Sequence, residues 1–431
     1  PQRDAGGVGR GAGTQGAMNH KKTDRLLGLC RKQRLPLIAF TEGGGGRPGD
    51  TDVPVIAGLD LTTFRDFAAL SGAVPRIAIA SGRCFAGNAA FVGCSDIAIA
   101  TADATIGMGG PVMIKGGGLG SFRAEEVGPA ASQAANGVVD LLVPDEAAAV
   151  RAAKRALGFF THGASPHFAN YSCADQQLLR DAVPAARLRA FDVRPIIETI
   201  ADRDSLLELR RDFAPAMVTA LLRVGGQPVG CIANHSGHLA GAIDADAADK
   251  AARFLQLCDA FDLPVLSLID TPGIMVGPEA ERAALVRHAA RLFTTAASMT
   301  VPVFAIVLRR GFGLGAMAMA AGGFHAPVFT VAWPTGEFGA MGLEGAVSTG
   351  FQKELAAVAD WSERQKLFDR LVREAHERGA ALDMAAHLEI DDVIDPAASR
   401  DWILRGLATR PPLADGGWAA RETPKRMIDT W

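Results

Sequence analysis

The chain reads VPVFAIV at residues 301–307 and VPRIAI at residues 74–79, and these two stretches decide the fold. Each is a short apolar run of the kind that forms a buried strand. The first leads into the glycine-rich segment GLGA at 313–316, and the second leads into AGNA at 86–89. The two arrangements are offset by 227 positions, so one unit of sequence is repeated.

A second pair of stretches repeats at nearly the same offset. LPLIAF at 35–40 leads to a four-glycine turn, LPVLSLI at 263–269 leads to DTPG at 270–273, and their prolines are 228 positions apart. Repetition at one offset indicates an internal duplication. Amphipathic helices are expected before these strands, at 22–34 and 247–261, and helices alternating with apolar strands favour parallel sheets. The sequence therefore predicts an α/β protein built from two duplicated units.

Composition disfavours several classes of function. The formal net charge is -3, and the 44 basic and 47 acidic residues are mixed along the chain, so no nucleic-acid partner is expected. The six cysteines form no Cys-x-x-Cys pair, which argues against a disulfide framework or a four-cysteine zinc site. Residues 312–333 carry no formal charge, but their glycines and Pro327 fit a buried strand, turn and helix better than a membrane span.

The two glycine-rich turns are the candidate chemical centres. A strand that delivers such a turn into a helix exposes backbone N–H groups at the positive end of the helix dipole. These groups bind a phosphate, or an oxygen that becomes negative during a reaction. Glycine is needed where a Cβ would block the ligand or where φ is positive. One such turn can equally serve packing, but two at equivalent places favour a functional role.

Nucleotide binding is disfavoured by the residues around these turns. The glycines at 44–49 have P-loop spacing, but Asp50 follows where Lys and Ser or Thr would be needed. The segment 311–316 mimics a dinucleotide fingerprint, yet the acidic residue expected about 20 residues later at the end of a second strand is missing. Neither a G-x-S-x-G elbow nor a metal-binding histidine spacing occurs, so no metal is expected in this chain.

From about residue 13 to residue 406, the chain resembles the carboxyltransferase subunits of biotin-dependent acyl-CoA carboxylases. The resemblance follows the order of that family's motifs along nearly the whole chain. The motifs that carry it are GRCFAGNA at 82–89, IDTPG at 269–273, RHAARL at 287–292, AWPTGE at 332–337 with MG at 341–342 and GA at 345–346, and DVIDP at 392–396.

The resemblance implies two crotonase-like domains of the ClpP/crotonase ββα-superhelix type, which agrees with the duplication. The expected boundaries are an N-terminal carboxyltransferase domain at 1–165, truncated at its start, a connecting segment at 166–210, and a C-terminal carboxyltransferase domain at 211–431. In the family, each active site lies between the N-domain of one subunit and the C-domain of another. A homo-oligomer of dimer units, up to a hexamer, is therefore expected.

The resemblance also implies a mechanism that uses no side-chain base. Carboxybiotin releases CO2, the biotin enolate removes a proton from the α-carbon of the thioester, and the acyl enolate captures the CO2. Two enolates form, so two backbone oxyanion holes are needed. Gly87 and Asn88, preceded by Ala86, match the hole for the acyl-CoA. Leu314 and Gly315, preceded by Gly313, match the hole for biotin.

Several residues around the holes carry narrower expectations. Asn88 stands where the family has glycine, and its side chain is expected to narrow the acyl pocket. Met317 stands where propionyl-type enzymes carry aspartate, which disfavours a propionyl-CoA substrate, and Phe312 with Met317 is expected to line the substrate or biotin site. Gly315→Ala keeps the backbone donor that Gly315→Pro removes, and it is expected to be the milder change if the local φ is negative. Asp270 is expected to cap a turn.

The implied partners are a biotin carboxyl carrier and a biotin carboxylase, each on another subunit or domain, and the expected location is cytoplasmic without membrane contact. Biotin would arrive as carboxybiotin on the carrier, and acyl-CoA would be the substrate. Two alternatives remain open, a biotin-dependent decarboxylase of a carboxyacyl-CoA and a non-catalytic scaffold of the same fold. The final residues, from Pro411 onward, are expected to form an exposed tail.

Overall fold

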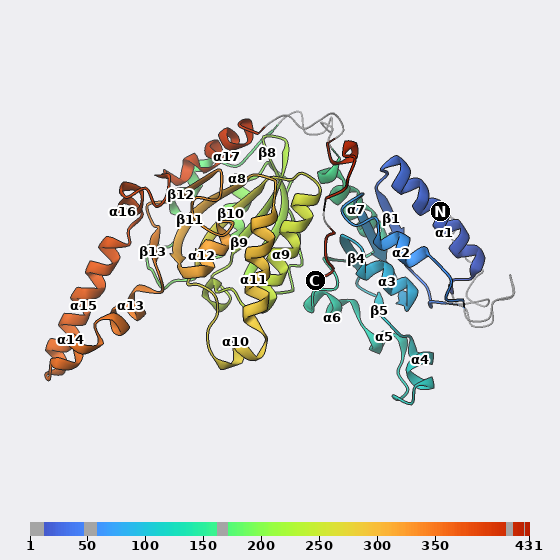
Figure 1. The fold of residues 1–431 in the computed structure, drawn as a ribbon, viewed down its shortest axis with the longest axis horizontal. Coiled ribbons are helices and arrows are strands. Elements are labelled where there is room, and N and C mark those ends of the chain that lie inside the picture. The colour runs from blue at the N-terminus through green and yellow to red at the C-terminus, as the bar shows by residue number, and fades with distance from the viewer. Residues whose placement is uncertain (1–12, 47–57, 162–170, 411–416, 426) are drawn as a thin grey trace.

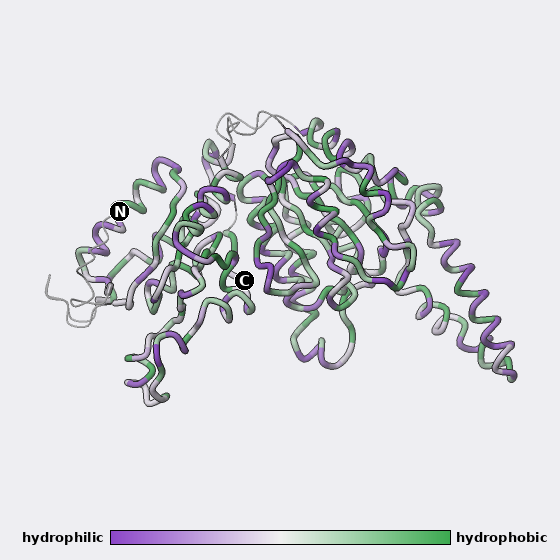
Figure 2. The backbone as a smooth tube through the Cα atoms, turned by 180° about the vertical axis from the view of Figure 1, so that it is seen from behind, coloured by the Kyte–Doolittle hydropathy of each residue, from purple (hydrophilic) through white to green (hydrophobic). Residues whose placement is uncertain are grey.

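The computed structural model describes residues 13–46, 58–161, 171–410, 417–425 and 427–431. Figure 1 shows two lobes side by side, the first in blue and blue-green and the second from green to orange. Each lobe is a sheet with helices on its faces, entirely parallel in the first lobe and parallel over most of the second, as the apolar strands predict. The hydrophobic residues in Figure 2 concentrate on the strands and on the helices that pack against them.

The first lobe contains a four-stranded sheet in the order β1-β2-β4-β6, with every pairing parallel. Strands β2 and β4 are buried along their whole length because helices cover the sheet, and they are apolar except for Arg76 and Thr101. The elements of this lobe are α1 (Ala17–Gln33), β1 (Leu37–Phe40), α2 (Thr63–Ala68), β2 (Arg76–Ala80), β3 (Arg83–Phe85), α3 (Gly87–Gly93), β4 (Ile97–Thr101), β5 (Thr105–Gly107), α4 (Pro111–Gly116), α5 (Ala124–Val127), α6 (Ala130–Ala135), β6 (Leu141–Val143) and α7 (Glu146–Phe160).

The second lobe contains a larger sheet in the order β14-β12-β11-β10-β9-β8-β7, in which β7, β8 and β9 pair antiparallel and the others parallel. Its strands are β7 (Leu207–Leu209), β8 (Met217–Val224), β9 (Gln227–Asn234), β10 (Val265–Thr271), β11 (Val303–Phe312), β12 (Phe329–Ala332), β13 (Glu337–Gly339) and β14 (Asp392–Val393). Its helices are α8 (Arg194–Ile200), α9 (Ala245–Ala260), α10 (Pro278–Arg282), α11 (Leu285–Ser298), α12 (Gly313–Met319), α13 (Leu343–Gly350), α14 (Gln352–Ala357), α15 (Trp361–Arg378), α16 (Ala381–Ala386) and α17 (Ser399–Ala408).

The strand order repeats between the lobes as the duplication predicts. The order β1-β2-β4-β6 corresponds to β10-β11-β12-β14, and in each lobe a glycine-rich turn and a short helix follow the second of these strands. A short parallel pairing accompanies each turn, β3 with β5 in the first lobe and the end of β11 with β13 in the second. The two turns therefore occupy equivalent positions.

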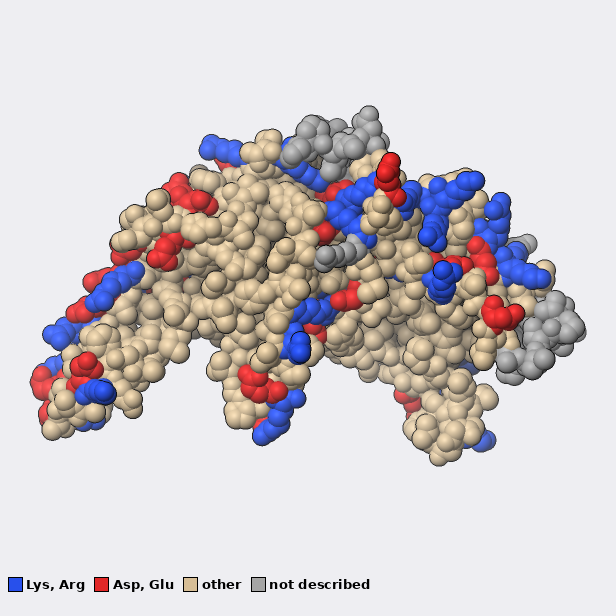
Figure 3. Space-filling view, in the orientation of Figure 1, with Lys and Arg blue, Asp and Glu red and all other residues tan. Residues whose placement is uncertain are grey.

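Three segments project from one side of the molecule (Figures 1 and 3). They carry α4 with α5, α10, and α13 to α15. Figure 3 also shows Lys and Arg gathered over the first lobe, where α1 exposes Lys21, Lys22, Arg25, Arg31 and Lys32. Within the described ranges, no helix is both long enough and apolar enough to cross a membrane.

The predicted exposed tail is wrong at Trp418 and Ile428, which are buried, whereas residues 422–424, 430 and 431 are exposed. Trp418 is buried and its indole N–H donates to the carbonyl of Phe160 at 2.6 Å, in the first lobe. The backbone N–H of Ile428 donates to the Ser71 hydroxyl at 3.0 Å, and that of Asp429 donates to Oε1 of Gln256 at 2.9 Å, in the second lobe. The terminal segment thus bridges both lobes, a role that its polar composition conceals.

Candidate active site

The first glycine-rich turn joins β3 to α3 through a strained backbone. Ala86, the residue before the helix, has φ 53° and ψ -121°, and its N–H donates to the carbonyl of Gly107 at 3.0 Å. A non-glycine residue at positive φ costs free energy and persists where surrounding structure enforces it. At the following residue, Gly87, an added Cβ would lie 2.7 Å from Cζ of Phe64 and 2.9 Å from Oε1 of Gln15, so the ends of these two side chains would have to move.

Asn88 is buried, and its side chain binds the backbone of the four-glycine turn that follows β1. Its Nδ2 donates to the carbonyl of Glu42 at 2.9 Å, and its Oδ1 accepts from the N–H of Gly45 at 3.2 Å. The amide therefore holds the four-glycine turn that follows β1. The expectation that this side chain narrows the acyl pocket stays a prediction, and the structure adds that both of its polar atoms bind that turn.

The second turn joins β11 to α12 and is built differently. Gly313 has φ 56°, a conformation that side chains rarely adopt, while Leu314 is 60% exposed. Gly315 is buried against the segment after β10, where a Cβ on it would lie 2.6 Å from the carbonyl carbon of Gly273. Backbone rather than a movable side chain fills that space, so we expect Gly315→Ala to displace the turn or the loop, and its ranking below Gly315→Pro stays a prediction.

Two cavities flank the second turn. One, of about 620 Å³, is lined by Gly313, Leu314 and apolar side chains of α11 and of the loop at 272–276, called the Gly273 loop. The other, of about 600 Å³, contains Met317, which is 38% exposed, beside Gly313. Phe312 is buried and packs near Gly339, so it supports the turn from behind. Leu314 and Met317 thus line different cavities.

The two turns lie in different lobes of the same chain (Figure 1). Every residue that lines either cavity beside the second turn falls between 272 and 389, in the second lobe. The structure therefore brings Phe312, Gly313, Leu314 and Met317 together, and places Ala86, Gly87 and Asn88 separately.

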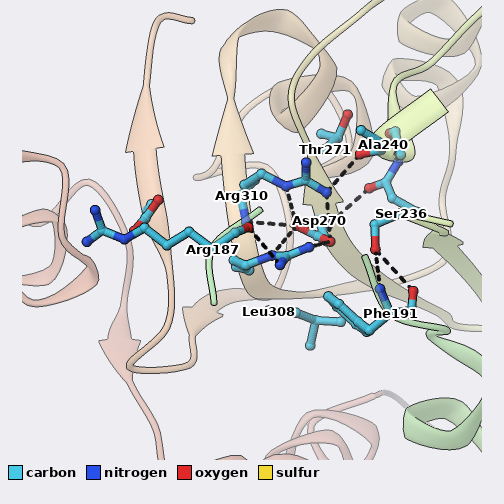
Figure 4. A network of polar contacts seen from close by, with 12 residues as sticks. Arg187, Phe191, Ser236, Ala240, Asp270, Thr271, Leu308 and Arg310 are labelled. Atoms are coloured by element: carbon cyan, nitrogen blue, oxygen red, sulfur yellow. Dashed lines mark hydrogen bonds and ion pairs between the residues drawn. The ribbon is translucent and has the colours of Figure 1, made fainter. Parts of the chain in front are cut away.

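Asp270, at the end of β10, is fully buried and bound by two arginines (Figure 4). Arg309 donates to both carboxylate oxygens at 3.2 and 2.9 Å, and Arg310 donates through its side chain at 2.8 and 3.0 Å and through its backbone N–H at 3.1 Å. Burial alone would raise the pKa of this carboxyl, but the bonds from Arg310 and Arg309 outweigh it, and the pKa lies below its usual range. The carboxylate joins two strand ends, which differs from the turn cap expected for it.

Sequence reasoning missed this cluster because its significance depends on pairing. In the sequence, Asp270 stands only as an acidic residue after an apolar strand, and nothing links it to Arg309 and Arg310. The signal that could have found them is the parallel alignment of the two strands, which places their carboxyl ends at the same edge of the sheet.

Comparisons with known proteins agree with this architecture. The carboxyl transferase domain family matches residues 10–410. The methylmalonyl-CoA carboxyltransferase 12S subunit of Propionibacterium freudenreichii subsp. shermanii is 33% identical over 400 residues, covering 92% of this chain and 75% of that protein. A putative propionyl-CoA carboxylase beta chain of Bacillus subtilis is 30% identical over 396 residues, covering 91% of this chain and 77% of that protein.

Solved structures show the same relationship. A single-chain, multi-domain long-chain acyl-CoA carboxylase superimposes with a TM-score of 0.84 and 56% identity, over 91% of this chain and 38% of its own. The transcarboxylase 12S hexamer with methylmalonyl-CoA bound gives a TM-score of 0.81 and 30% identity, over 94% of this chain and 79% of its own. This chain thus spans about three quarters of the 12S subunit and a smaller part of the multi-domain carboxylase. It belongs to the carboxyl transferase domain family.

Proposed function

We propose that this chain transfers a carboxyl group from carboxybiotin to the α-carbon of an acyl-CoA thioester. The observation that carries the proposal is the pair of glycine-rich turns at equivalent positions of a duplicated fold. In each turn a glycine lies where an added Cβ would collide with neighbouring atoms, at Gly87 in one lobe and at Gly315 in the other. Two such turns suit a reaction in which negative charge develops on two oxygen atoms.

In this mechanism the chain supplies position and backbone donors. The N–H groups of Gly87 and Asn88 stabilise the thioester oxygen when the α-carbon loses its proton, and those of Leu314 and Gly315 stabilise the ureido oxygen of biotin. CO2 leaves carboxybiotin, the ureido nitrogen takes the α-proton, and the α-carbon bonds to the CO2. The products are biotin and a carboxyacyl-CoA, so no proton or electron is left over.

The cavity beside Gly313 and Leu314 fits the donor substrate. Its volume of about 620 Å³ lies in the range of small-molecule sites, and its apolar lining suits a fused ring with a single polar edge. A biotin carboxyl carrier would bring this ring, and a biotin carboxylase, on a partner or on another part of the polypeptide, would load it.

The shared site of the family implies that a complete site here needs two copies of the chain, with the first turn of one copy facing the second turn of the other. The projection at α4 exposes Val112 (85%), Met113 and Leu119, and the projection at α10 exposes Val276 (82%). Clusters of exposed apolar side chains of this kind mark interaction surfaces. We therefore expect dimers or larger assemblies by light scattering, and an active monomer would contradict the shared site.

An acyl-CoA with a long chain is the favoured substrate. Met317 gives its cavity an apolar wall, and the 56% identical relative acts on long-chain acyl-CoA according to its name. The test is carboxylation of a series of thioesters from acetyl-CoA to palmitoyl-CoA. If the corresponding free acids react as well as the thioesters, the assignment of CoA binding fails.

Decarboxylation of a carboxyacyl-CoA is the second candidate, because the same two holes serve both directions. It is supported by the methylmalonyl-CoA decarboxylase subunit alpha of Propionigenium modestum, which is 29% identical over 402 residues. The two candidates separate when the carrier is supplied in its carboxylated or its free form. Faster turnover with the carboxylated carrier supports carboxylation, and faster turnover with the free carrier and a carboxyacyl-CoA supports the reverse.

A further inference from the structure

Asp270 lies where β10 and β11 separate, just before each strand leads into its own loop. Strands β10 and β11 run parallel from Val265 beside Val303, and their register shifts between Ile269 and Thr271. At this shift the Asp270 carboxylate accepts the backbone N–H of Arg310 at 3.1 Å. Beyond it, β10 continues into the Gly273 loop and β11 continues into the glycine-rich turn.

The two segments then meet again in direct contact. A Cβ at Gly315 would lie 2.7 Å from Cα of Gly273 and 2.9 Å from the backbone nitrogen of Ile274. The Gly273 loop is itself held by Thr271, whose hydroxyl accepts the N–H of Gly273 at 3.1 Å. Any displacement of one strand end relative to the other would therefore shift Gly315 against the loop.

The same arginines reach two other parts of the chain (Figure 4). Arg309 donates to the carbonyls of Arg187 and Arg189 at 3.0 and 2.8 Å, and its guanidinium lies 4.8 Å from the ring centroid of Phe191. Arg310 donates to the carbonyl of Ala240 at 2.8 Å. The stretch 187–191, which the sequence presents only as part of a connection between domains, is thus fastened to the strand ends below the second turn.

We infer that Asp270 is a positioning residue for the second turn, acting through Arg309 and Arg310 on the placement of Leu314 and Gly315. This inference rests on the proposed function, because it concerns the same turn. Five hydrogen bonds converge on one buried carboxylate between β10 and β11, the strand that leads into the turn. In an active site a displacement of about 1 Å can cost roughly 10²-fold in rate.

The test compares Asp270→Asn with Asp96→Asn in the full chain. Asp96 makes an equally buried ion pair with Arg76, at 2.6 Å, in the first lobe. Asp96→Asn therefore controls for the general loss of stability when a buried ion pair is broken. We expect amide hydrogen exchange of residues 311–319 to accelerate in Asp270→Asn and to stay at the parent rate in Asp96→Asn. This measurement needs no substrate.

The second measurement is carboxyl transfer to free biotin from a carboxyacyl-CoA, with kcat and KM determined separately. We expect kcat to fall about 10²-fold in Asp270→Asn, while KM for the thioester stays within about twofold. Should Asp270→Asn fail to fold, Arg310→Gln replaces it, because that change removes two of the five bonds and leaves those from Arg309. It should shift exchange and kcat in the same direction by a smaller factor.

Unchanged exchange at 311–319 in a folded variant would overturn the positioning role, as would equal acceleration in Asp96→Asn. A parent protein without carboxyl transfer would instead refute the proposed function, and the exchange comparison would still decide the placement of the turn. A loss of kcat that is equal in both variants would show that Asp270 acts only through stability.

Discussion

The two glycine-rich turns occupy equivalent places but are held by different chemistry. Asn88 and Gly315 correspond at the offset of 227, yet Asn88 reaches the loop after β1 through its amide, whereas Gly315 touches the loop after β10 with its own backbone. In the second lobe, the anchoring is done instead by the buried Asp270 and two arginines. A duplicated fold can thus keep a turn in place while exchanging the groups that hold it.

The largest expected effect follows from making the second turn like the first. Gly315→Asn would place a side chain 2.6 Å from the backbone of Gly273, so the turn or the loop must move. The loss of an oxyanion donor costs about 10²–10³ in turnover. We expect a decrease of that size in carboxyl transfer to free biotin, measured in protein that remains folded by circular dichroism. Retained turnover would mean that the two turns are interchangeable.

Removing the anchor of the first turn should have a smaller effect. Asn88→Ala leaves the carbonyl of Glu42 and the N–H of Gly45 without their partner, which costs about 1–3 kcal/mol when the groups are buried. We expect a lower midpoint of thermal unfolding and a higher KM for acyl-CoA, with KM for free biotin unchanged. Asn88→Asp serves as the control, because it keeps one acceptor for Gly45 and loses the donor to Glu42.

Acid should separate the two anchors, because only one of them titrates. The pKa of Asp270 is lower in the folded protein than its usual value of about 3.9, so its contribution to stability is complete above that pH and is lost as pH falls through the folded value. We expect hydrogen exchange at 311–319 to accelerate in acid, relative to its intrinsic rate, before exchange at 87–93 does. Simultaneous acceleration would indicate that the carboxylate does not hold the second turn.

The smallest expected effect concerns substrate length. Met317→Ala removes apolar wall from its cavity, and a single methylene in an apolar pocket is worth about 1–3 kcal/mol. We expect kcat/KM for palmitoyl-CoA to fall by about tenfold, with acetyl-CoA little changed. An equal change for both thioesters would remove Met317 from the acyl site.

The sequence was sufficient to predict the duplication and both turns, because the apolar strands and the glycines that follow them recur at an offset of 227 or 228 residues. The helices expected at 22–34 and 247–261 are confirmed, at Ala17–Gln33 and Ala245–Ala260. The fold class is confirmed by the structural relatives, while the domain boundaries stay predictions.

The features that could not be predicted depend on contacts between segments that are far apart in the sequence. The direction of the Asn88 side chain and the contact of Gly315 with Gly273 are set by loops that follow other strands, far away in the sequence. The burial of Trp418 depends on Phe160 and Phe261, which polar neighbours in the tail do not reveal. The assignment of each turn to a substrate stays a prediction for the same reason.

The most direct test of the central claim, that each turn serves a different substrate, is decarboxylation of carboxybiotin without acyl-CoA. Gly315→Pro removes a backbone donor from the second turn, and Gly87→Ala crowds the first turn only against the ends of the Phe64 and Gln15 side chains. In folded, oligomeric protein, decarboxylation should fall about 10²–10³-fold in Gly315→Pro and survive largely in Gly87→Ala. Equal loss in both variants, or no loss in Gly315→Pro, would contradict the assignment.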